Sequence, residues 1–238
     1  MAINNQKGFT LIELMMTLVI GAMIAGAAYA TYIFQQKSYY TQDQVAEMQQ
    51  NLRAALYSVI KEIQMAGYNP VGSGNFGITS ALAGRLQLTK DEDEDGVFDP
   101  EERLDIGFTN AVSSEHRDVD GNGIPDLSTN GVPNAVNLSI QEYSTAGNPG
   151  GYQAIAENIQ AVEFLYLNSA GTNLALTPPV NLSAVRSIQI TLLARSEHSD
   201  PQFTNSMTYT TPSGQNWGPY NDNFRRRLLT TTIKCRNL

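Results

Sequence analysis

Residues 91–102 carry oxygen-bearing side chains at the spacing of a calcium-binding loop. The segment fits the pattern D-x-[DN]-x-[DN]-G-x5-E at every fixed position, with Gly96 at the sharp turn. The predicted ligands are Asp91, Asp93, Asp95, the Val97 carbonyl, Asp99 and, bidentately, Glu102. Magnesium prefers fewer protein ligands and more water, so Ca²⁺ is the cofactor that this spacing favours.

A second acidic loop, residues 118–129, repeats most of this pattern. It offers Asp118, Asp120, Asn122, the Ile124 carbonyl and Asp126. Its twelfth position is Thr129, so the closing Glu is missing and a lower affinity is expected unless another residue completes the shell. Both loops are similar to extracellular Asp-rich calcium repeats. The alternative for each is a solvated acidic loop without a fixed ion.

The N-terminal region contains a long apolar segment with a single charge. Residues 9–34 hold only one charged side chain, Glu13. Such a helix would be about 39 Å long, enough to cross a bilayer core with some tilt. Lys7 before it fits a cytoplasmic leader under the positive-inside rule. An acid within a membrane helix costs about 2.5–3.5 kcal/mol at the bilayer centre, so Glu13 is expected to have a partner.

The heptapeptide at residues 7–13, Lys-Gly-Phe-Thr-Leu-Ile-Glu, resembles the class III signal of type IV prepilins. The resemblance implies that residues 1–8 are a leader, which prepilin peptidase removes between Gly8 and Phe9, and that Phe9 is then N-methylated. It also implies that Glu13 docks the incoming subunit through the α-amino group of a neighbouring chain. The alternative is an acid that snorkels from the helix end.

The helix is expected to continue beyond the membrane as an amphipathic segment, residues 35–67. Its apolar stripe has helical spacing and consists of Val45, Leu52, Leu56, Val59 and Ile63. Gly67 and Pro70 provide the stop signal.

Residues 68–238 are predicted to form a β-rich globular domain. Apolar residues alternate along short runs at 86–88, 104–108, 136–140, 162–166 and 188–192, and residues 228–235 are also rich in β-formers. Residues 154–160 are interpreted as one helical turn before a strand. The predicted fold class is α+β and pilin-like, with one long N-terminal helix packed on an antiparallel sheet.

Later segments resemble PilW-type minor pilins. They are residues 52–68, which end in Met-Ala-Gly-Tyr, and the C-terminal stretch that starts at Arg225-Arg226-Arg227. The expected function is therefore a minor pilin that assembles with other minor pilins and the major pilin, in an initiating complex at the tip. It would be anchored in the inner membrane with a periplasmic domain, and later lie in the pilus at the cell surface.

Two other functions are compatible with these features. One is a subunit similar to pseudopilin J of type II secretion, which is a relative of this family. The other is a calcium-dependent adhesin on a pilus tip, for which the Asp-rich loops and the polar segment 199–223 are the motivation.

Composition and missing motifs exclude several classes. The net charge of −8 disfavours nucleic-acid binding, and the single cysteine, Cys235, excludes an internal disulfide. No phosphate-binding loop, zinc spacing or nucleophile elbow occurs, so an enzyme is not expected. The run Arg225–Arg227 could contact phospholipid or an acidic neighbour, or form a solvated strand edge. Trp217 and Tyr220 could form a binding patch or a small satellite core.

Overall fold

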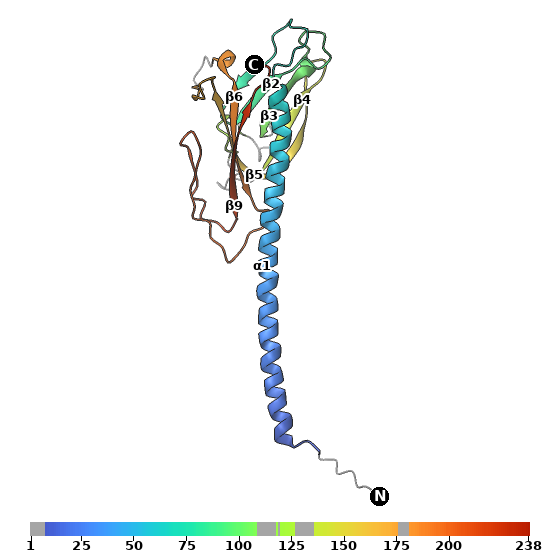
Figure 1. Cartoon of the computed structure of the whole chain (residues 1–238), viewed down its shortest axis with the longest axis vertical. Coiled ribbons are helices and arrows are strands. Elements are labelled where there is room, and N and C mark those ends of the chain that lie inside the picture. The colour runs from blue at the N-terminus through green and yellow to red at the C-terminus, as the bar shows by residue number, and fades with distance from the viewer. Residues whose placement is uncertain (1–7, 109–117, 119, 127–135, 176–180) are drawn as a thin grey trace. The chain divides into compact units, whose positions relative to one another are not determined.

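The computed structural model describes residues 8–108, 118, 120–126, 136–175 and 181–238. Its elements are α1 (Leu11–Met65), β1 (Ile78–Ala81), β2 (Arg85–Thr89), a 3₁₀ turn (Pro100–Glu102), β3 (Arg103–Phe108), β4 (Val136–Tyr143), β5 (Pro149–Leu167), a second 3₁₀ turn (Leu182–Ala184), β6 (Ser187–Arg195), β7 (Tyr209–Thr210), β8 (Asn216–Trp217) and β9 (Arg226–Lys234) (Figure 1). The chain divides into two compact units, Met1–Gln44 and Val45–Leu238.

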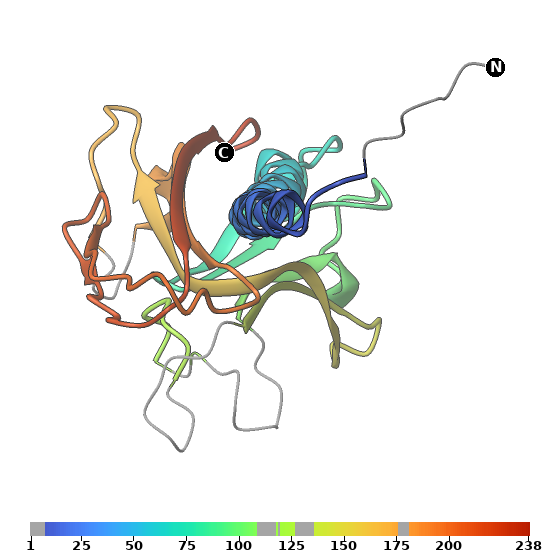
Figure 2. The same ribbon diagram turned by 90° about the horizontal axis from the view of Figure 1, so that it is seen from below.

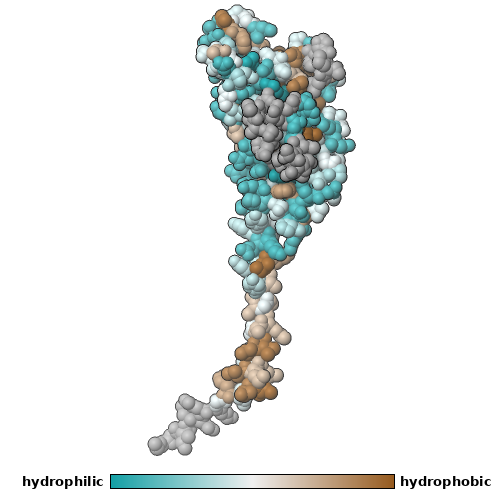
Figure 3. All heavy atoms as spheres, turned by 180° about the vertical axis from the view of Figure 1, so that it is seen from behind, coloured by the Kyte–Doolittle hydropathy of each residue, from teal (hydrophilic) through white to brown (hydrophobic). Residues whose placement is uncertain are grey.

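The first unit is the N-terminal part of α1. Within the described residues, α1 is the helix that is long and apolar enough to cross a membrane, and none of its most apolar stretch is buried within the protein. Large side chains such as Leu11, Ile20 and Phe34 are exposed, and hydrophobic residues cover this part of the helix (Figure 3). Exposed apolar residues all round a helix suit a lipid or helix-bundle environment rather than water.

The second unit is built on the C-terminal part of α1, around which the sheet curls (Figure 2). The predicted stripe provides the contacts, because Leu52, Val59 and Ile63 are at most 1% exposed and share one core with the sheet. The helix ends just before Gly67, as predicted from the stop signal.

Among the described residues, seven strands form one antiparallel sheet in the order β1-β2-β3-β4-β5-β6-β9. The apolar residues that alternate in the sequence meet across neighbouring strands: Ile106 pairs with Ile140, and Phe164 with Ile190. Their side chains face the helix and are buried or nearly so. The predicted α+β fold, one long helix on an antiparallel sheet, is confirmed.

One local prediction is wrong. Residues 154–160 are not a helical turn, because β5 begins at Pro149 and runs through them. Pairing with β4 accounts for the extended backbone, since Ala154 lies opposite Ser139 and Gln153 opposite Ile140. Here hydrogen bonding to a neighbouring strand overrides the helix preference of a short Ala-containing segment.

The other face of the sheet is partly covered by the segment between β6 and β9. A small second core consists of Ala161, Leu193, Tyr209 and Trp217, with Ile124, Tyr220 and Leu228 packed against it. Trp217, the chain's only tryptophan, is 1% exposed. Its ring, and the half-buried Tyr220 beside it, therefore belong to a satellite core, one of the two interpretations considered for them.

Candidate functional site

Glu13 lies in the first turn of α1, and its carboxylate faces back to the helix start. The Thr10 hydroxyl accepts a hydrogen bond from the Glu13 amide (3.3 Å), and the Thr10 amide donates to Glu13 Oε2 (3.4 Å). This reciprocal pattern is a capping box, a signal present in the sequence as Thr10-x-x-Glu13 but not used above. Gly8 and Phe9 precede the helix and are exposed.

The first acidic loop brings three of its predicted ligands together. One carboxylate oxygen from each of Asp91, Asp93 and Asp95 lies within 4.8 Å of the other two. Backbone amides hold two of the side chains in place: Gly96 N–H donates to Asp91 Oδ2 (3.1 Å), and Val97 N–H donates to Asp95 Oδ1 (2.7 Å). Gly96 itself has φ +74°, a conformation that side-chain-bearing residues rarely adopt.

Asp91 is the unusual member of this group. It is 0% exposed, and its Oδ1 accepts no hydrogen bond from any residue that the structure describes. A buried carboxylate oxygen without a donor is costly unless a cation or a proton compensates it. Among the described residues, no lysine or arginine lies within 4.0 Å of Asp91, Asp93 or Asp95, and the nearby Lys90 pairs with Glu62 (3.3 Å) and Glu92 (3.6 Å).

Glu102, the predicted bidentate ligand, holds the backbone of the loop in this structure. Its Oε1 accepts the amide of Glu92 (2.7 Å) and its Oε2 accepts the amide of Asp99 (2.9 Å). Neither Glu102 nor Asp99 belongs to the group of carboxylates that meet within 4.8 Å. The side chain of Glu102, which is 3% exposed, thus ties the start of the loop to its end.

The loop is also connected to the segment that follows α1. The Asp91 amide donates to the Tyr68 carbonyl (2.8 Å), and the Tyr68 hydroxyl donates to Glu94 Oε1 (3.0 Å). The hydrogen bond and the charge of Glu94 raise the pKa of Tyr68. The Ser73 hydroxyl donates to the Gly96 carbonyl (3.1 Å). Loop 91–97 therefore holds residues 68–73 in place.

The second acidic loop has the same backbone pattern with fewer acids. Gly123 N–H donates to Asp118 Oδ2 (2.8 Å), and Ile124 N–H donates to Asn122 Oδ1 (2.7 Å), as at the equivalent positions of the first loop. Asp120 is exposed, Asp126 is half-buried, and Thr129 lies outside the described residues. Burial raises the pKa of Asp118 to about 6, with a further contribution from Asp120.

This second loop is fastened to the sheet. The Gly84 amide donates to the Gly121 carbonyl (2.8 Å), and the Val162 amide on β5 donates to the Gly123 carbonyl (2.8 Å). A Cβ on Gly123 would lie 1.8 Å from the Val162 carbonyl oxygen, so only glycine fits. The sheet thus holds the turn of the loop through these two backbone hydrogen bonds.

Arg225 and Arg226, two of the three arginines in the run 225–227, are not a solvated edge, whereas Arg227 is exposed. The side chain of Arg226 is 0% exposed; it forms two 2.5 Å contacts with the Asp222 carboxylate and donates to Gln160 Oε1 (2.5 Å). Its guanidinium also stacks 4.0 Å from the centre of the Tyr220 ring. Burial acts to raise the pKa of Asp222, but the hydrogen bonds from Arg226 and the Phe224 amide and the charges of Arg226 and Arg195 together hold that pKa below its usual value.

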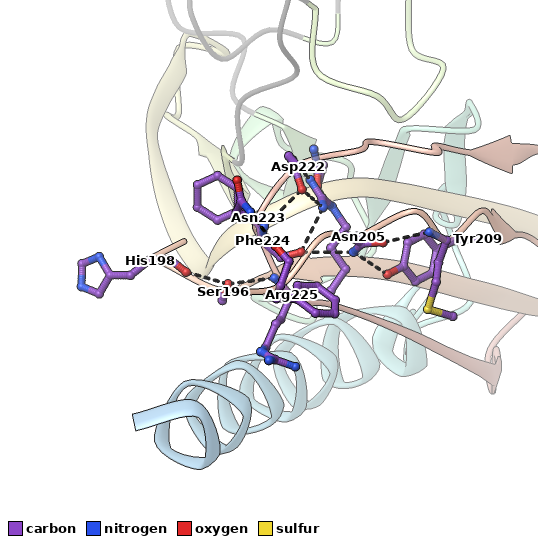
Figure 4. A network of polar contacts seen from close by, with 12 residues as sticks. Ser196, His198, Asn205, Tyr209, Asp222, Asn223, Phe224 and Arg225 are labelled. Carbon is purple, nitrogen blue, oxygen red and sulfur yellow. Dashed lines mark hydrogen bonds and ion pairs between the residues drawn. The ribbon is translucent and has the colours of Figure 1, made fainter. Parts of the chain in front are cut away.

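Arg225 is arranged in the same way. It pairs with Asp200 (2.7 Å) and stacks 4.3 Å from the centre of the Phe203 ring. The backbone around it is fixed as well, because the Arg225 amide donates to the Ser196 hydroxyl (3.2 Å) and Asn205 donates to the Phe224 carbonyl (3.1 Å) (Figure 4). The network fastens the segment between β6 and β9 to the sheet, and its acidic partners come from the same chain.

Comparison with known proteins matches two parts of the chain. The family described as "Prokaryotic N-terminal methylation motif" matches residues 3–29, and "Type IV Pilus-assembly protein W" matches residues 126–237. A solved type IV-like pilin from Thermus thermophilus is similar at 15% identity and a TM-score of 0.41, over 79% of this chain and 96% of that chain. No curated protein matches the chain.

Proposed function

We propose that the chain is a type IV minor pilin of PilW type that serves in pilus assembly, and that it acts in an initiating complex with other minor pilins at the pilus tip. The observation that carries this proposal is the presence of both signatures in one chain, the methylation motif at residues 3–29 and the PilW domain at residues 126–237. The motif implies processing by a prepilin peptidase and assembly with other pilins, and the apolar helix after it fits membrane anchoring.

In this proposal, cleavage after Gly8 leaves Phe9 as the methylated N-terminus. The subunit waits in the inner membrane with its second compact unit in the periplasm, and later enters a pilus at the cell surface. The apolar, exposed surface of α1 supports this role, because it suits lipid before assembly and helix packing afterwards. In this proposal the contribution of the chain is structural, in line with the description of the matched family as a pilus-assembly protein.

Glu13 is proposed to bind the α-amino group of a neighbouring subunit. Its carboxylate lies in the first helical turn, close to the chain end that cleavage would create. A carboxylate and an ammonium group in an apolar surrounding attract each other strongly and relieve the cost of burying either alone.

The direct test is peptide mass spectrometry on sheared filaments and on the inner-membrane fraction. We expect a peptide that begins at N-methylated Phe9 in both fractions, at low abundance in the filaments. A mature peptide confined to the membrane fraction would contradict incorporation at the tip, and an uncut N-terminus in both fractions would contradict processing.

The docking role is tested by the variant Glu13→Ala. We expect normal cleavage and methylation but a loss of piliation close to that of the deletion strain. If the deletion strain lacks pili while the variant assembles them normally, Glu13 has no docking role.

A further inference from the structure

We propose that the first acidic loop binds one calcium ion through the carboxylates of Asp91, Asp93 and Asp95, and that the ion fastens the segment after α1 to the sheet. The geometry fits the ion. Calcium holds oxygen ligands at about 2.3–2.6 Å, so two oxygens on one ion lie up to about 5 Å apart. The three carboxylate oxygens lie within 4.8 Å of one another.

The second observation is independent of the cluster itself. Asp91 is completely buried, and its Oδ1 has no donor among the described residues, although its Oδ2 accepts the Gly96 amide. The unpaired oxygen therefore belongs to a carboxylate that already faces Asp93 and Asp95. A bound cation would satisfy this oxygen and remove the repulsion among the three charges.

The protein itself supplies no such cation within the described residues. Lys90 pairs with Glu62 and Glu92, and the Tyr68 hydroxyl donates to Glu94. Asp93 and Asp95 remain exposed to solvent, so an ion can reach the group.

Glu102 acts in this proposal as a positioning residue. Both of its carboxylate oxygens accept backbone amides, from Glu92 and Asp99, and so fix the loop in shape. Three carboxylates with the remaining positions filled by carbonyl oxygen and water suit calcium, which tolerates irregular coordination, better than magnesium, which requires a near-octahedral shell.

The ion would order more than the loop. The Asp91 backbone donates to the Tyr68 carbonyl, and the Gly96 carbonyl accepts the Ser73 hydroxyl. Calcium on Asp91 would therefore stabilise the contacts of Asp91 with Tyr68 and of Gly96 with Ser73. These contacts hold residues 68–73, the segment that follows α1. In a chain whose single cysteine cannot form an internal disulfide, this provides a non-covalent link between the helix end and the sheet.

The test uses the full-length protein in detergent, with calcium chloride as the only added ligand, and three single variants. Asp93→Asn removes a ligand charge, while its amide oxygen can still accept the Asp95 amide as Asp93 does. Glu101→Gln is the matched control, because Glu101 is an exposed acid of the same segment outside the group of three. Asp120→Asn controls for binding at the second loop.

Hydrogen–deuterium exchange locates the ion, and calorimetry gives its affinity. We expect calcium to slow exchange at residues 91–97 and 68–73 in the wild type, Glu101→Gln and Asp120→Asn. Asp93→Asn should bind calcium at this loop at least tenfold more weakly. No calcium-dependent protection of residues 91–97 in the wild type, or an equal loss in Glu101→Gln, would overturn the site.

Glu102→Gln separates positioning from ligation. We expect faster exchange of the Glu92 and Asp99 amides without calcium, because glutamine cannot accept from both, whereas Asp93→Asn leaves these amides unchanged in calcium-free buffer. If Glu102→Gln weakens calcium binding while these amides stay protected without calcium, Glu102 is a ligand and the positioning role is wrong.

Discussion

Arg225 and Arg226 each meet an aspartate and an aromatic ring, whereas Asp91, Asp93 and Asp95 face one another with no basic side chain within 4.0 Å among the described residues. Both are clusters of like charge in the sequence, and both lie in the second compact unit. Each of these two arginines has its counter-charge within the chain, although Arg225 Nε has no hydrogen-bond partner among the described residues. The aspartates leave a buried oxygen unpaired, which suggests that their counter-charge comes from outside. A charged cluster is thus informative about ligands only after its internal partners are known.

The second acidic loop is intermediate in this respect between the arginine cluster and the first acidic loop. It has the same turn as the first loop, but the sheet holds it through Gly121 and Gly123. Burial raises the pKa of its Asp118 carboxylate to about 6, so a proton neutralises this buried charge only as the pH falls toward that value. The comparison therefore predicts that removing an acid lowers stability at the arginine cluster but raises it at the first acidic loop when calcium is absent.

The largest effect is expected at the arginine cluster. Asp222→Asn would leave the guanidinium of Arg226, which is 0% exposed, without its counter-charge. Removal of one partner of a buried ion pair costs about 3 kcal/mol or more, so the free energy of unfolding should fall by about that amount. Urea unfolding followed by the fluorescence of Trp217, which lies in the adjacent core, measures it.

The matched control for this variant is Glu197→Gln, which removes an exposed acid nearby and should change stability by less than about 0.5 kcal/mol. If Asp222→Asn is equally mild, the arginine cluster does not depend on its internal counter-charges and the contrast with the first loop fails.

At the first loop, removal of an acid is expected to increase the free energy of unfolding. Asp91→Asn removes a buried, unpaired negative charge and keeps an oxygen that can accept the Gly96 amide. In calcium-free buffer the variant should be more stable than the wild type by about 1 kcal/mol, because a buried unsatisfied charge is lost. Thermal unfolding in EGTA tests this, and the order should reverse in excess calcium. A variant less stable than the wild type in both buffers would show that Asp91 is already compensated within the chain.

The smallest expected effect is the pH dependence of stability in calcium-free buffer, which arises from Asp118 and Asp222. The folded protein binds the Asp118 proton more tightly than the unfolded chain does, with a pKa of about 6 against the usual 3.8, so this group favours folding increasingly as the pH falls from about 6 toward 3.8. Asp222 behaves in the opposite way: its pKa is below 3.8, and its contribution is lost as the pH falls through that lower value.

As the pH is lowered from 7 to 5, hydrogen exchange corrected for its intrinsic pH dependence should therefore slow at residues 120–126. It should not change at residues 222–226. Asp120→Asn should shift the first effect to lower pH, because the Asp120 charge contributes to the raised pKa of Asp118. Equal responses of the two segments would remove the distinction between them.

Much of the fold could be predicted from periodicity. The helical stripe through Leu52, Val59 and Ile63 and the alternation in β3 and β6 all reflect burial on one face, which the residue types record directly. The first half of β5 was missed because residues such as Ala154 and Gln153 have little β-preference of their own. Their extended conformation depends on β4, a partner that a local pattern does not show.

In the candidate sites too, some features can be predicted from local sequence and others depend on distant parts of the chain. The spacing of the three aspartates of the first loop alone predicts that their carboxylates meet, as they do in the structure. Glu102 was interpreted only as a ligand, although Asp99-Pro100-x-Glu102 also has the form of a helix start, with proline in the first turn and a glutamate that accepts the first amide. Burial of Arg226 could not be predicted, because it depends on the path of the segment between β6 and β9 across the sheet.

The capping box at the start of α1 makes any later binding at Glu13 an exchange rather than an addition. In the docking proposed for Glu13, a neighbouring subunit displaces the Thr10 amide, and α1 then gives up a cap of the kind that contributes about 0.5–2 kcal/mol. The bonds to Thr10, at 3.3–3.4 Å, are long, so this internal competitor is a weak one. Before assembly the acid thus has a temporary partner within its own chain, which it can release without unfolding the helix.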